Sequence, residues 1–507
     1  MTIAEVCILL AIIVYLAGML GVGFRFAKKN HSVDDFYLGG RKLGPFVTAM
    51  SAEASDMSSW LLMGLPGVAY LTGLAEASWT AIGLAVGTYL NWLIVAKRLR
   101  RYSTRLGAIT VPQFFSKRWG DERNLLSAIA AVIIIIFFVP YLASGFSACG
   151  KLFGTLFGVD YGVAMLISAT IIVIYTVLGG FLAASFTDLV QSIIMTIALI
   201  VVLGFGVTKA GGIGAVVSNA QSMAGYLSLS NIYNPSTGGA DPYSFLTICS
   251  LLAWGLGYFG MPHILVRFMA IEDEKKLPLS RRVATVWVVI SMAVAVFIGV
   301  VGNGMTRAGA LEELADSETI IVRIASLIAQ HGVLAALLAG IILAGILAAT
   351  MSTADSQLLA ASSSVSQNLV GEFFGIKLDS KKSMTLARSV MVAISVIAVF
   401  LARNPNSSVF RVVSFAWAGF GAAFGPAVIL GLFWKRSNKW GALAGMVVGG
   451  SMVFFWKYCI APLGGAFAIY ELLPAFVAAS IAIVVVSLLT AKPDASIEKI
   501  FDEVSAE

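Results

Sequence analysis

The polar run Ser51-Ala52-Glu53-Ala54-Ser55-Asp56-Met57-Ser58-Ser59 lies inside a stretch, from Pro45 to Gly73, that is otherwise apolar. Six of its nine side chains are polar, and two of them are carboxylates. Such groups cost several kcal/mol each at bilayer depth unless they line a cavity, bind an ion or pair. Serine and aspartate also compete for backbone hydrogen bonds, so we expect the helix to break here and restart near Trp60. A broken, polar membrane helix is typical of solute and ion sites, which makes transport the first hypothesis.

A second interrupted segment, from Trp254 to His263, reads Trp-Gly-Leu-Gly-Tyr-Phe-Gly-Met-Pro-His. Three glycines and a proline disfavour a continuous helix, although close helix packing through small residues is the alternative explanation. The segment follows the first by five predicted helices and starts on the opposite side of the membrane. Interrupted helices at such corresponding positions are typical of an inverted repeat. Trp254 and Tyr258, at i and i+4, would share one helix face, as an aromatic wall or as simple packing.

Hydroxyl groups gather in a third segment, Thr350-Met351-Ser352-Thr353-Ala354-Asp355-Ser356. In membrane helices, Ser and Thr usually bond back to the preceding turn. Four hydroxyls and a carboxylate within seven residues exceed that use, and oxygen ligands suit a hard cation. A sodium ion needs about five such oxygens and little formal charge. We therefore expect carbonyls of the first segment and hydroxyls of this one to hold sodium, and we assign no role to Asp355.

The composition indicates a polytopic membrane protein. Hydrophobic residues make up 59% of the 507 residues, charged residues 12%, and the mean hydropathy is +0.90. A soluble chain could not bury so much apolar surface. The start, Met1-Thr2-Ile3-Ala4-Glu5, lacks a basic region and a cleavage site, so we expect the first apolar run to be retained as a helix. The four cysteines are far apart and the three histidines (His31, His263 and His331) do not cluster, so no cofactor and no disulfide is expected.

Apolar runs that are long enough to span a bilayer predict thirteen helices. They lie near residues 5–25, 46–73, 77–96, 124–150, 160–178, 188–208, 244–268, 283–303, 328–365, 386–402, 409–434, 440–460 and 470–490. Counting Lys and Arg in alternate connections places 27 of the 34 on one side. The positive-inside rule makes that side cytoplasmic, so the N-terminus is expected outside and the C-terminus inside. The basic excess therefore needs no nucleic-acid partner to explain it.

Several further groups of residues follow one another in a specific order. They are Tyr37-Leu38-Gly39-Gly40-Arg41; Ser55-Asp56-Met57 with Trp60-Leu61-Leu62-Met63-Gly64-Leu65-Pro66-Gly67; Tyr175 with Gly179-Gly180-Phe181; Trp254 to Phe268; Met351-Ser352-Thr353; Trp417-Ala418-Gly419-Phe420-Gly421-Ala422-Ala423-Phe424-Gly425-Pro426; and Arg436 with Gly441-Ala442 and Gly445. In these residues the chain resembles the sodium:solute symporter family, and within it the sodium/proline permeases. The resemblance runs from about Asp34 to Leu489, nearly the whole chain.

The resemblance implies an all-α membrane protein with a leucine-transporter-like core of two inverted five-helix repeats and three added helices. It implies a transporter rather than an enzyme. The chain would divide into a first helix with a cytoplasmic loop, a first repeat of helices 2–6, an extracellular loop, a second repeat of helices 7–11, helices 12–13, and a cytoplasmic tail. These parts correspond to residues 1–44, 45–208, 209–243, 244–434, 435–490 and 491–507.

The resemblance also implies functional residues, position by position. The sodium site would use the carbonyls of Ala54, Met57 and Ala349 and the hydroxyls of Ser352 and Thr353. The proline pocket would involve Ser58, Tyr141, Trp254, Tyr258 and Pro262. Asp56 would be required for sodium dependence. Asp188, at the cytoplasmic start of helix 6, and Arg41 would contribute to coupling. From the chemistry of a zwitterion, we add the N–H groups of Ser58, Ser59 and Trp60, which at a restarted helix would face the substrate carboxylate. Asp56 is also counted among the substrate-binding residues.

Simpler explanations remain open for four of these positions. Asp56 could cap the second half of its helix, an interaction worth about 1 kcal/mol that would also hold the break open. Asp188 could be an interfacial carboxylate at a helix start, where the helix dipole favours it. Arg41 could be a topology charge in a basic loop. Tyr141, which follows Pro140, could be a packed tyrosine with a bonded hydroxyl.

Glu53 and Ser59 depart from the permease pattern, in which small residues are expected. A carboxylate three residues before Asp56 could meet it across one helical turn and allow a second cation or proton coupling.

The prediction is sodium-driven import of L-proline by alternating access in the cell membrane. The alternative is a sodium- or proton-coupled symporter of another small solute, such as pantothenate or another amino acid.

Three other classes fit the sequence less well. Nothing resembles the ring of filter loops that a passive channel needs. A membrane sensor would need a longer tail than the 17 residues after Thr490. An intramembrane enzyme would need a nucleophile with a base, or a metal centre, and no such group of residues is visible.

Overall fold

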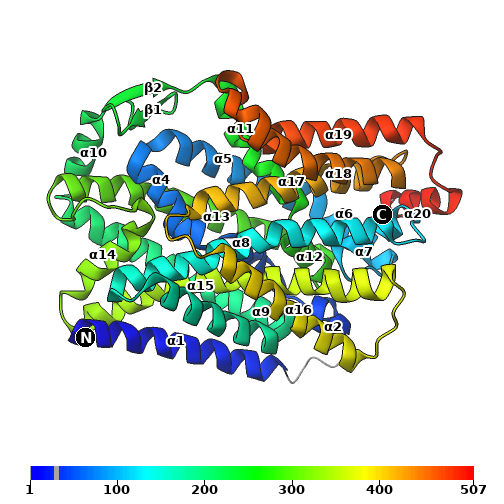
Figure 1. The fold of residues 1–507 in the computed structure, drawn as a ribbon, viewed down its shortest axis with the longest axis horizontal. Coiled ribbons are helices and arrows are strands. Elements are labelled where there is room, and N and C mark those ends of the chain that lie inside the picture. The colour runs from blue at the N-terminus through cyan, green and yellow to red at the C-terminus, as the bar shows by residue number, and fades with distance from the viewer. Residues whose placement is uncertain (1, 28–32, 507) are drawn as a thin grey trace.

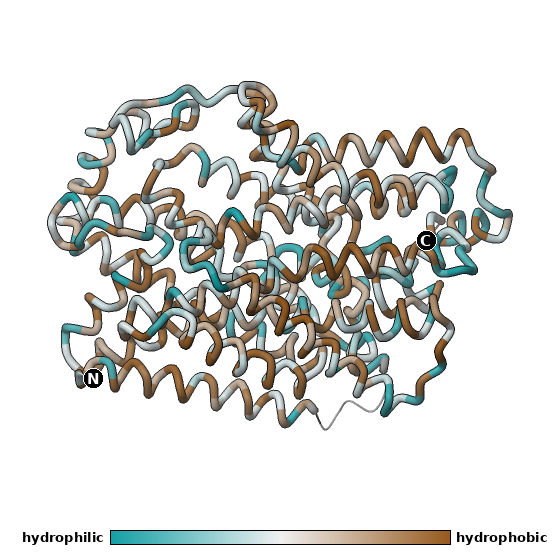
Figure 2. Tube along the Cα trace, in the orientation of Figure 1, coloured by the Kyte–Doolittle hydropathy of each residue, from teal (hydrophilic) through white to brown (hydrophobic). Residues whose placement is uncertain are grey.

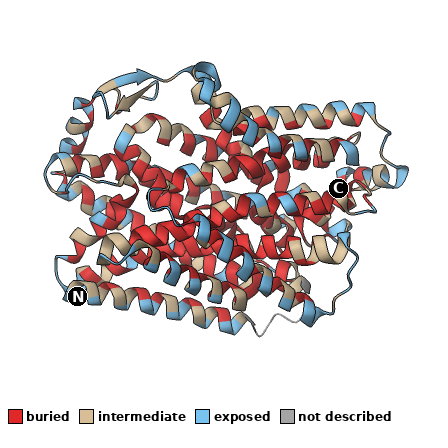
Figure 3. Cartoon of the chain, in the orientation of Figure 1, coloured by how far each residue is buried: buried red, intermediate tan, exposed pale blue. Residues whose placement is uncertain are grey.

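The computed structural model describes residues 2–27 and 33–506, which form an elongated bundle of long helices (Figure 1). The N- and C-terminal ends lie at opposite ends of the bundle. Hydrophobic residues follow the helices and hydrophilic residues gather toward the two ends (Figure 2). Buried residues concentrate in the central helices (Figure 3). His31, and the predicted cytoplasmic lysines Lys28 and Lys29, lie outside the described residues.

Within the described chain, ten helices are long and apolar enough to cross a membrane. Some of them continue into π-helical or further α-helical segments. They are α1 (Ile3–Ala27), α5 (Leu74–Leu90) with η3 (Asn91–Val95) and α6 (Ala96–Arg105), α8 (Leu125–Phe157), α9 (Tyr161–Lys209), α13 (Leu277–Arg307), α15 (Val333–Ser363) with η7 (Ser364–Phe373), α16 (Ser380–Leu401), α17 (Val409–Phe433), α18 (Lys439–Phe455) with η8 (Trp456–Ile460), and α19 (Leu472–Leu489).

Two other segments are interrupted near their middles. The first consists of α3 (Pro45–Asp56), the π-helical turn η2 (Trp60–Gly64) and α4 (Leu65–Thr72), and the second of α11 (Phe245–Leu252), the 3-10 helix η4 (Ala253–Gly260) and α12 (Pro262–Ala270). The halves of the second segment meet at 48°. Met57 (φ −72°, ψ 67°) and Met261 (φ −75°, ψ 108°) leave the helical conformation at the two breaks. Both breaks predicted from the sequence are therefore confirmed.

Helix α9 runs through what the sequence predicted as two separate helices. Gly180, with φ 72° and ψ −177°, interrupts its helical geometry. Glycine adopts a positive φ without the steric cost that a Cβ would add. The helix resumes directly after this kink, so Asp188 is not at the start of a helix as expected. Asp188 is fully buried within the helical run, which excludes the interfacial explanation.

Short elements connect the spanning helices. They are α2 (Val33–Leu38), η1 (Gly39–Arg41), α7 (Val111–Arg118), α10 (Ile213–Ser222), β1 (Asn231–Asn234), β2 (Gly239–Pro242), η5 (Glu274–Lys276), η6 (Ser317–Thr319), α14 (Ile320–Ala329), η9 (Ala461–Leu463), η10 (Gly465–Phe467) and α20 (Ala495–Ala506). The chain is mostly helical, as expected, and β1 and β2 add a short antiparallel hairpin with Asn231 opposite Pro242.

Side-chain caps explain why several helices begin where they do. Asp160 accepts a hydrogen bond from the Val163 N–H at 3.1 Å, before α9. Asn438 Oδ1 accepts one from the Gly441 N–H at 2.9 Å, before α18. Each cap satisfies an N–H group that the first turn of a helix leaves without an intrahelical partner, and is worth about 1 kcal/mol.

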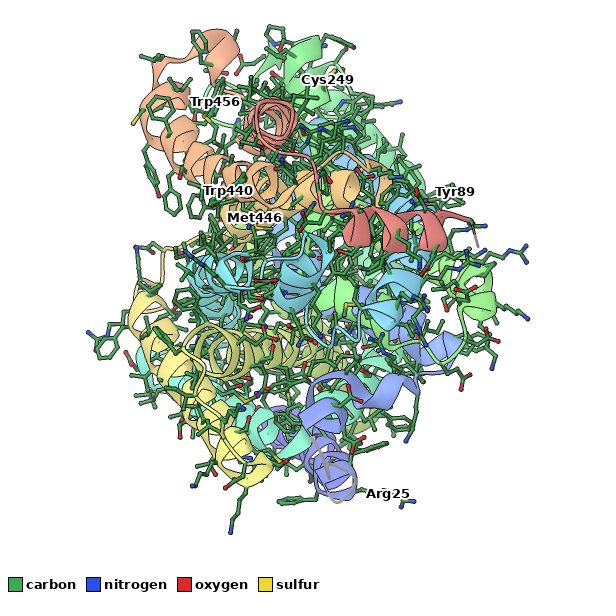
Figure 4. All side chains as sticks on the ribbon, turned by 90° about the vertical axis from the view of Figure 1, so that its right-hand side faces the viewer. Arg25, Tyr89, Cys249, Trp440, Met446 and Trp456 are labelled. Carbon is green, nitrogen blue, oxygen red and sulfur yellow. The ribbon has the colours of Figure 1, made fainter. Side chains whose placement is uncertain are left out.

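Helix α20 lies across the end of the bundle that faces the viewer in Figure 4, where α1 and α19 are seen end-on on opposite sides. Its Phe501 is buried. The guanidinium groups of Arg98 and Arg118 lie 5.0 and 5.1 Å from the centre of the Phe501 ring. The next residue, Asp502, pairs with Lys435 at 2.6 Å. The helix therefore holds α6 and α7 to the loop that follows α17.

The glycines of η4 pack against neighbouring backbones and rings. A Cβ on Gly255 would lie 2.2 Å from the carbonyl oxygen of Gly83 on α5. A Cβ on Gly257 would lie 1.9 Å from Trp417 Nε1 on α17. Because atoms cannot approach so closely, these positions admit only glycine. Both explanations considered for this segment hold, since the helix is broken and its glycines also serve close packing.

Candidate functional site

The end of α3 contacts the middle of α15, and this contact brings together oxygens predicted for sodium. The Ser352 hydroxyl lies within hydrogen-bond distance of two carbonyl oxygens, Ala54 at 2.7 Å and Ala349 at 3.1 Å. Thr353 Oγ1 is buried and has no hydrogen-bond partner among the described residues. Met57 is fully buried at the adjoining break. Hydroxyl and carbonyl oxygens of two helices thus form a donor set of the kind that a sodium ion prefers.

Three aromatic side chains from three elements converge on Asp56. The Tyr258 hydroxyl, from η4, donates to Asp56 Oδ2 at 2.7 Å. The Tyr141 hydroxyl, from α8, and Trp60 Nε1, from η2, both donate to the Asp56 carbonyl oxygen at 3.2 Å. Asp56 Oδ2 accepts from Tyr258 and Oδ1 has no partner among the described residues, so the carboxylate caps no N–H group of η2 and the capping explanation for Asp56 is wrong. Asp56 instead joins the break in the first segment to the break in the second.

The turn between α3 and η2 uses some of its N–H groups internally. The Ser58 N–H donates to the Asp56 carbonyl at 2.7 Å, and the Trp60 N–H donates to Ser58 Oγ at 3.4 Å. Ser59 Oγ is buried and has no partner within the described part of the chain. A π-helical turn such as η2 is rare and occurs frequently at functional sites. A substrate carboxylate that bound to these two N–H groups would have to replace their internal hydrogen bonds.

Trp254 and Tyr258 do not share one face as expected. They lie on a 3-10 helix, in which residues four apart differ by about 120° rather than lying above one another. Trp254 packs its ring against Tyr470 at 5.0 Å and Phe410 at 5.4 Å between centroids. Tyr258 points to Asp56 and meets the edge of Trp417 at 5.1 Å. Trp417 lies between them, with its ring centre 6.3 Å from that of Trp254, so the two rings contact one another only through Trp417.

A cavity of about 1030 Å³ leads from one end of the bundle to Trp254 and Phe410. At its wall, the Glu318 carboxylate accepts hydrogen bonds from Lys151 Nζ at 2.7 Å, the Ser408 hydroxyl at 2.9 Å and the Phe410 N–H at 3.1 Å. On the other side of the site, the crevice at Pro262 encloses only about 30 Å³. Access to the site is thus wide from one side and closed from the other.

Asp188 forms a buried ion pair with Arg267, in which Nη2 lies 3.1 Å from Oδ2. Ser51 Oγ donates to the same carboxylate at 2.6 Å and accepts from Arg267 Nε at 2.9 Å. Ser356 Oγ accepts from Arg267 at 2.5 Å, and its hydroxyl is 3.2 Å from Asp355 Oδ1. This network ties α3, α9, α12 and α15 together. Arg267 was one of the 27 basic residues expected in cytoplasmic connections, and this expectation is wrong because its side chain is only 1% exposed.

Arg41 joins three segments at the closed side of the site. Its guanidinium donates to the Met269 carbonyl at 2.6 Å, to the Ala108 carbonyl at 2.6 Å and to Ser103 Oγ at 3.2 Å. Burial lowers the pKa of Arg41 to about 10, and the neighbouring Arg100 adds to this effect. Arg41 is therefore more than a topology charge, because its donors hold α12 to α6 and to the loop before α7.

A comparison with protein families matches residues 36–449 to the sodium:solute symporter family. The chain belongs to the sodium:solute symporter family. The resemblance seen in the sequence is thereby confirmed, and this family member is a multi-pass transporter of the cell membrane and not an enzyme.

Individual relatives cover nearly the whole chain. The osmoregulated proline transporter OpuE of Bacillus subtilis is 42% identical over 495 residues, which are 97% of both chains. The sodium/proline symporter of Escherichia coli is 40% identical over 502 residues, 97% of this chain and 95% of that protein. Among solved structures, a sodium-coupled sialic acid symporter in a substrate-bound outward-open state has a TM-score of 0.78 at 19% identity, over 96% of this chain and 99% of that one. That likeness establishes the fold.

In this symporter, replacing Arg41 with lysine is expected to loosen the closed side. Lysine keeps the charge, but one ammonium group cannot reach the Met269 and Ala108 carbonyls together. A lost hydrogen bond to a charged group costs about 1.5 kcal/mol, or roughly tenfold. A cysteine placed at Ser363, which lines the closed crevice, should therefore react with a maleimide about tenfold faster in the Arg41→Lys protein.

The matched control for this experiment is a cysteine at Ser414, which lines the wide cavity. Its reaction rate should not rise in the same variant. Equal rates at Ser363 with Arg41 and with Lys would contradict the role of Arg41 in closing this side.

Sequence reasoning missed three residues of the symporter site. Arg267 gave a signal, because a charged residue within an apolar spanning segment usually faces the interior and has a partner. Trp417, whose Nε1 donates to the Trp254 carbonyl at 2.8 Å, was noticed only as part of a motif. Trp92, which donates to Glu53 at 2.8 Å, gave no signal of its own.

Proposed function

We propose that this symporter imports L-proline together with sodium by alternating access. The two relatives named above are proline transporters, and their identity of 40–42% extends over nearly the full chain. Proline is a compact zwitterion, so it needs donors for its carboxylate, acceptors for its ammonium and an apolar wall for its ring. The breaks place the Asp56 carboxylate and the Tyr258 hydroxyl beside the aromatic rings of Trp60 and Trp254, which supply an acceptor and an apolar wall.

One observation carries the proposal: a single backbone break serves the ion and the solute. The Ala54 carbonyl contacts the Ser352 hydroxyl on α15 at 2.7 Å, while Asp56, two residues later, bonds to Tyr258 on η4 at 2.7 Å. An ion that pulls the end of α3 toward α15 therefore moves the residue that faces the solute. Each inward sodium gains about 2.3 kcal/mol per 100 mV of membrane potential, which can concentrate a neutral zwitterion.

The residue roles follow from this arrangement. We propose that Ala54, Met57 and Ala349 supply carbonyl ligands to sodium and that Ser352 and Thr353 supply hydroxyls. Solute binding is assigned to the residues that line the two breaks and their aromatic neighbours: Asp56, Ser58, Ser59, Trp60, Tyr141, Trp254, Tyr258 and Pro262. Arg41 and Asp188 join the moving helices to the closed side and so take part in coupling.

We also propose the topology of thirteen spans, with the N-terminus outside and the C-terminus inside. The ten long helices support it together with the two interrupted segments and the kink at Gly180, which divides α9. The opposite positions of the two chain ends, seen in Figure 1, agree with an odd number of spans. The repeats are assigned to residues 45–208 and 244–434, separated by 209–243, preceded by 1–44 and followed by 435–490 and the tail 491–507. In this topology the wide cavity opens outward.

The proposal is tested by uptake of radiolabelled proline into proteoliposomes, with an inward gradient of sodium or of choline. We expect accumulation only with sodium, suppressed by excess unlabelled proline and unaffected by excess pantothenate. Suppression by pantothenate or by another amino acid, with little by proline, would replace proline as the substrate. Accumulation driven by a proton gradient without sodium would overturn sodium coupling.

A further inference from the structure

A cavity of about 510 Å³ lies between α1, α8, α9 and α15. Helix α1 runs along the edge of the bundle beside α9 and α15 (Figure 1). The roles proposed above for sodium and proline use none of the residues that line this cavity. Of the described residues that form its walls, only Glu5 and Ser168 are polar. The cavity is therefore a candidate site for an apolar ligand.

The cavity opens sideways toward the bilayer. Ile13 on α1 and Ile167 on α9 line it, and they are 52% and 57% exposed. Leu10 and Val163, on the same two helices, are exposed as well. Because both helices are long and apolar enough to span a membrane, these exposed side chains contact lipid. An acyl chain can therefore enter from the side, between α1 and α9.

The interior of the cavity is unsuited to water. Its one hydroxyl among the described residues, that of Ser168, donates to the Ala164 carbonyl at 2.8 Å. Glu5 lies at one end of the cavity, where its Oε2 accepts a hydrogen bond from the Thr2 N–H at 2.8 Å. A buried water needs about two to four polar partners, and cavities with apolar walls stay dry and take apolar ligands.

The length of the cavity matches one leaflet of a bilayer. Glu5 and Leu16, at its two ends along α1, are eleven residues apart, which is about 16 Å of helix. Half of a hydrocarbon core of about 30 Å is about 15 Å. In the proposed topology Glu5 lies toward the outer surface, so the cavity runs from that surface to the middle of the membrane. This is the path of an acyl chain of the outer leaflet.

The charges at the outer end favour one kind of headgroup. Glu5 lies there on α1, and the exposed Asp160 directly follows the lining residue Val159. Among the described residues, no lysine, arginine or histidine lines the cavity. The one basic residue of α8, Lys151, is already paired with two carboxylates of another segment. Two carboxylates attract an ammonium group and repel an anionic headgroup.

The inner end of the cavity reaches the helix that carries the proposed sodium ligands. Met351 lines the cavity and directly precedes Ser352 on α15. The Tyr15 hydroxyl, from α1, donates to the Met351 sulfur at 3.8 Å and accepts from Gln191 Nε2, on α9, at 3.0 Å. A chain that packs against Met351 therefore supports the turn of α15 that lies next to the ion.

We propose that the cavity binds one acyl chain of an outer-leaflet phospholipid with an ammonium headgroup, and that the bound chain strengthens sodium binding. The lipid site stands on the cavity alone, whereas its effect on sodium rests on the proposed function of Ser352. Coupling between two sites commonly changes affinity by about fivefold or more.

Native mass spectrometry of the purified protein tests the lipid site, because the mass gives the number of bound lipids and of polypeptides. The protein is offered equal amounts of phosphatidylethanolamine and phosphatidylglycerol. We expect one retained phosphatidylethanolamine per polypeptide in the wild type and none in Ala164→Phe, whose ring fills the cavity. Ala393→Phe, at an exposed position of α16 outside the cavity, is the matched control and should keep the lipid.

Equilibrium binding of ²²Na⁺ tests the effect on sodium. With phosphatidylethanolamine, the wild type should be half-saturated at about fivefold less sodium than with phosphatidylglycerol alone. In Ala164→Phe the two lipids should give the same half-saturation, because the ring takes the place of the chain. Equal values in the wild type would overturn the coupling. Absence of sodium binding in both lipids would overturn the proposed sodium site, while the lipid count still decides the cavity.

The mass spectra also contain the results that would overturn the lipid site. These are no lipid on the wild type, equal retention in Ala164→Phe, or a second polypeptide that Ala164→Phe removes. Equal retention of the two lipids by the wild type would overturn the role of the carboxylates. If Ala164→Phe fails to fold, Ile167→Trp decides, because its side chain lies at the exposed opening. Unchanged lipid retention in that variant would overturn the inference.

Discussion

Sodium activation of proline uptake is expected to weaken by at least about 100-fold when Ser352 and Thr353 are both replaced by alanine. Each hydroxyl that binds a charged group contributes about 1.5–3 kcal/mol, and every 1.4 kcal/mol is a factor of ten. Ser352 also holds the Ala54 carbonyl at 2.7 Å, so its loss releases the end of α3. The measurement is the sodium concentration that gives half-maximal uptake in proteoliposomes.

The control for this pair is Ser362→Ala. Ser362 lies on the same helix, is fully buried, and donates to the Leu359 carbonyl at 3.1 Å. Removing its hydroxyl should change the sodium requirement by less than about twofold, because a bond to the preceding turn of the same helix contributes little. If the two variants show the same sodium requirement, the ion does not bind between α3 and α15.

The second large effect is expected from replacing Arg267 with methionine. The change removes the positive charge from a pair that is fully buried and leaves the Asp188 carboxylate without its counter-ion. Breaking a buried pair by removing one partner costs about 3–5 kcal/mol of folding free energy. We expect a loss of stability of this size, measured by reversible unfolding of the purified protein in mixed micelles.

The double variant Arg267→Met/Asp188→Asn identifies the cause of that loss. Asparagine removes the unpaired charge and can still accept the hydrogen bond from Ser51, which lies 2.6 Å from the carboxylate. Most of the lost stability should return, since replacing both members of a buried pair is often nearly neutral. A double variant as unstable as Arg267→Met alone would show that packing of the arginine, and not its charge, is what matters.

The parts of the site that the sequence predicted are those with a local signal. The polar run that ends at Ser59 predicts a break because its side chains compete with the helix for hydrogen bonds to the backbone. The hydroxyl groups around Ser352 point to an ion because so many within two turns exceed what back-bonding uses. The glycines after Trp254 weaken their helix in every context. Each of these signals can be read within ten residues, without knowing which helices touch.

The parts that sequence reasoning missed depend on contacts across the fold. Whether Arg267 is a loop charge or a buried partner depends on Asp188, which is 79 residues away. The bond from Trp92 to Glu53 depends on how η3 packs on α3. The separate surroundings of Trp254 and Tyr258 depend on a change from α-helical to 3-10 geometry, which composition does not determine.

The close approach of η4 to α5 and α17 has a consequence for genetics. Any change in the first two nucleotides of a glycine codon adds a side chain or ends the protein, and the space at Gly255 and Gly257 admits none. A saturation mutagenesis screen would therefore score these codons as intolerant as that of Ser352. Because loss of growth reports a failed scaffold and a failed ion site alike, such a screen must be read together with the amount of protein that reaches the membrane.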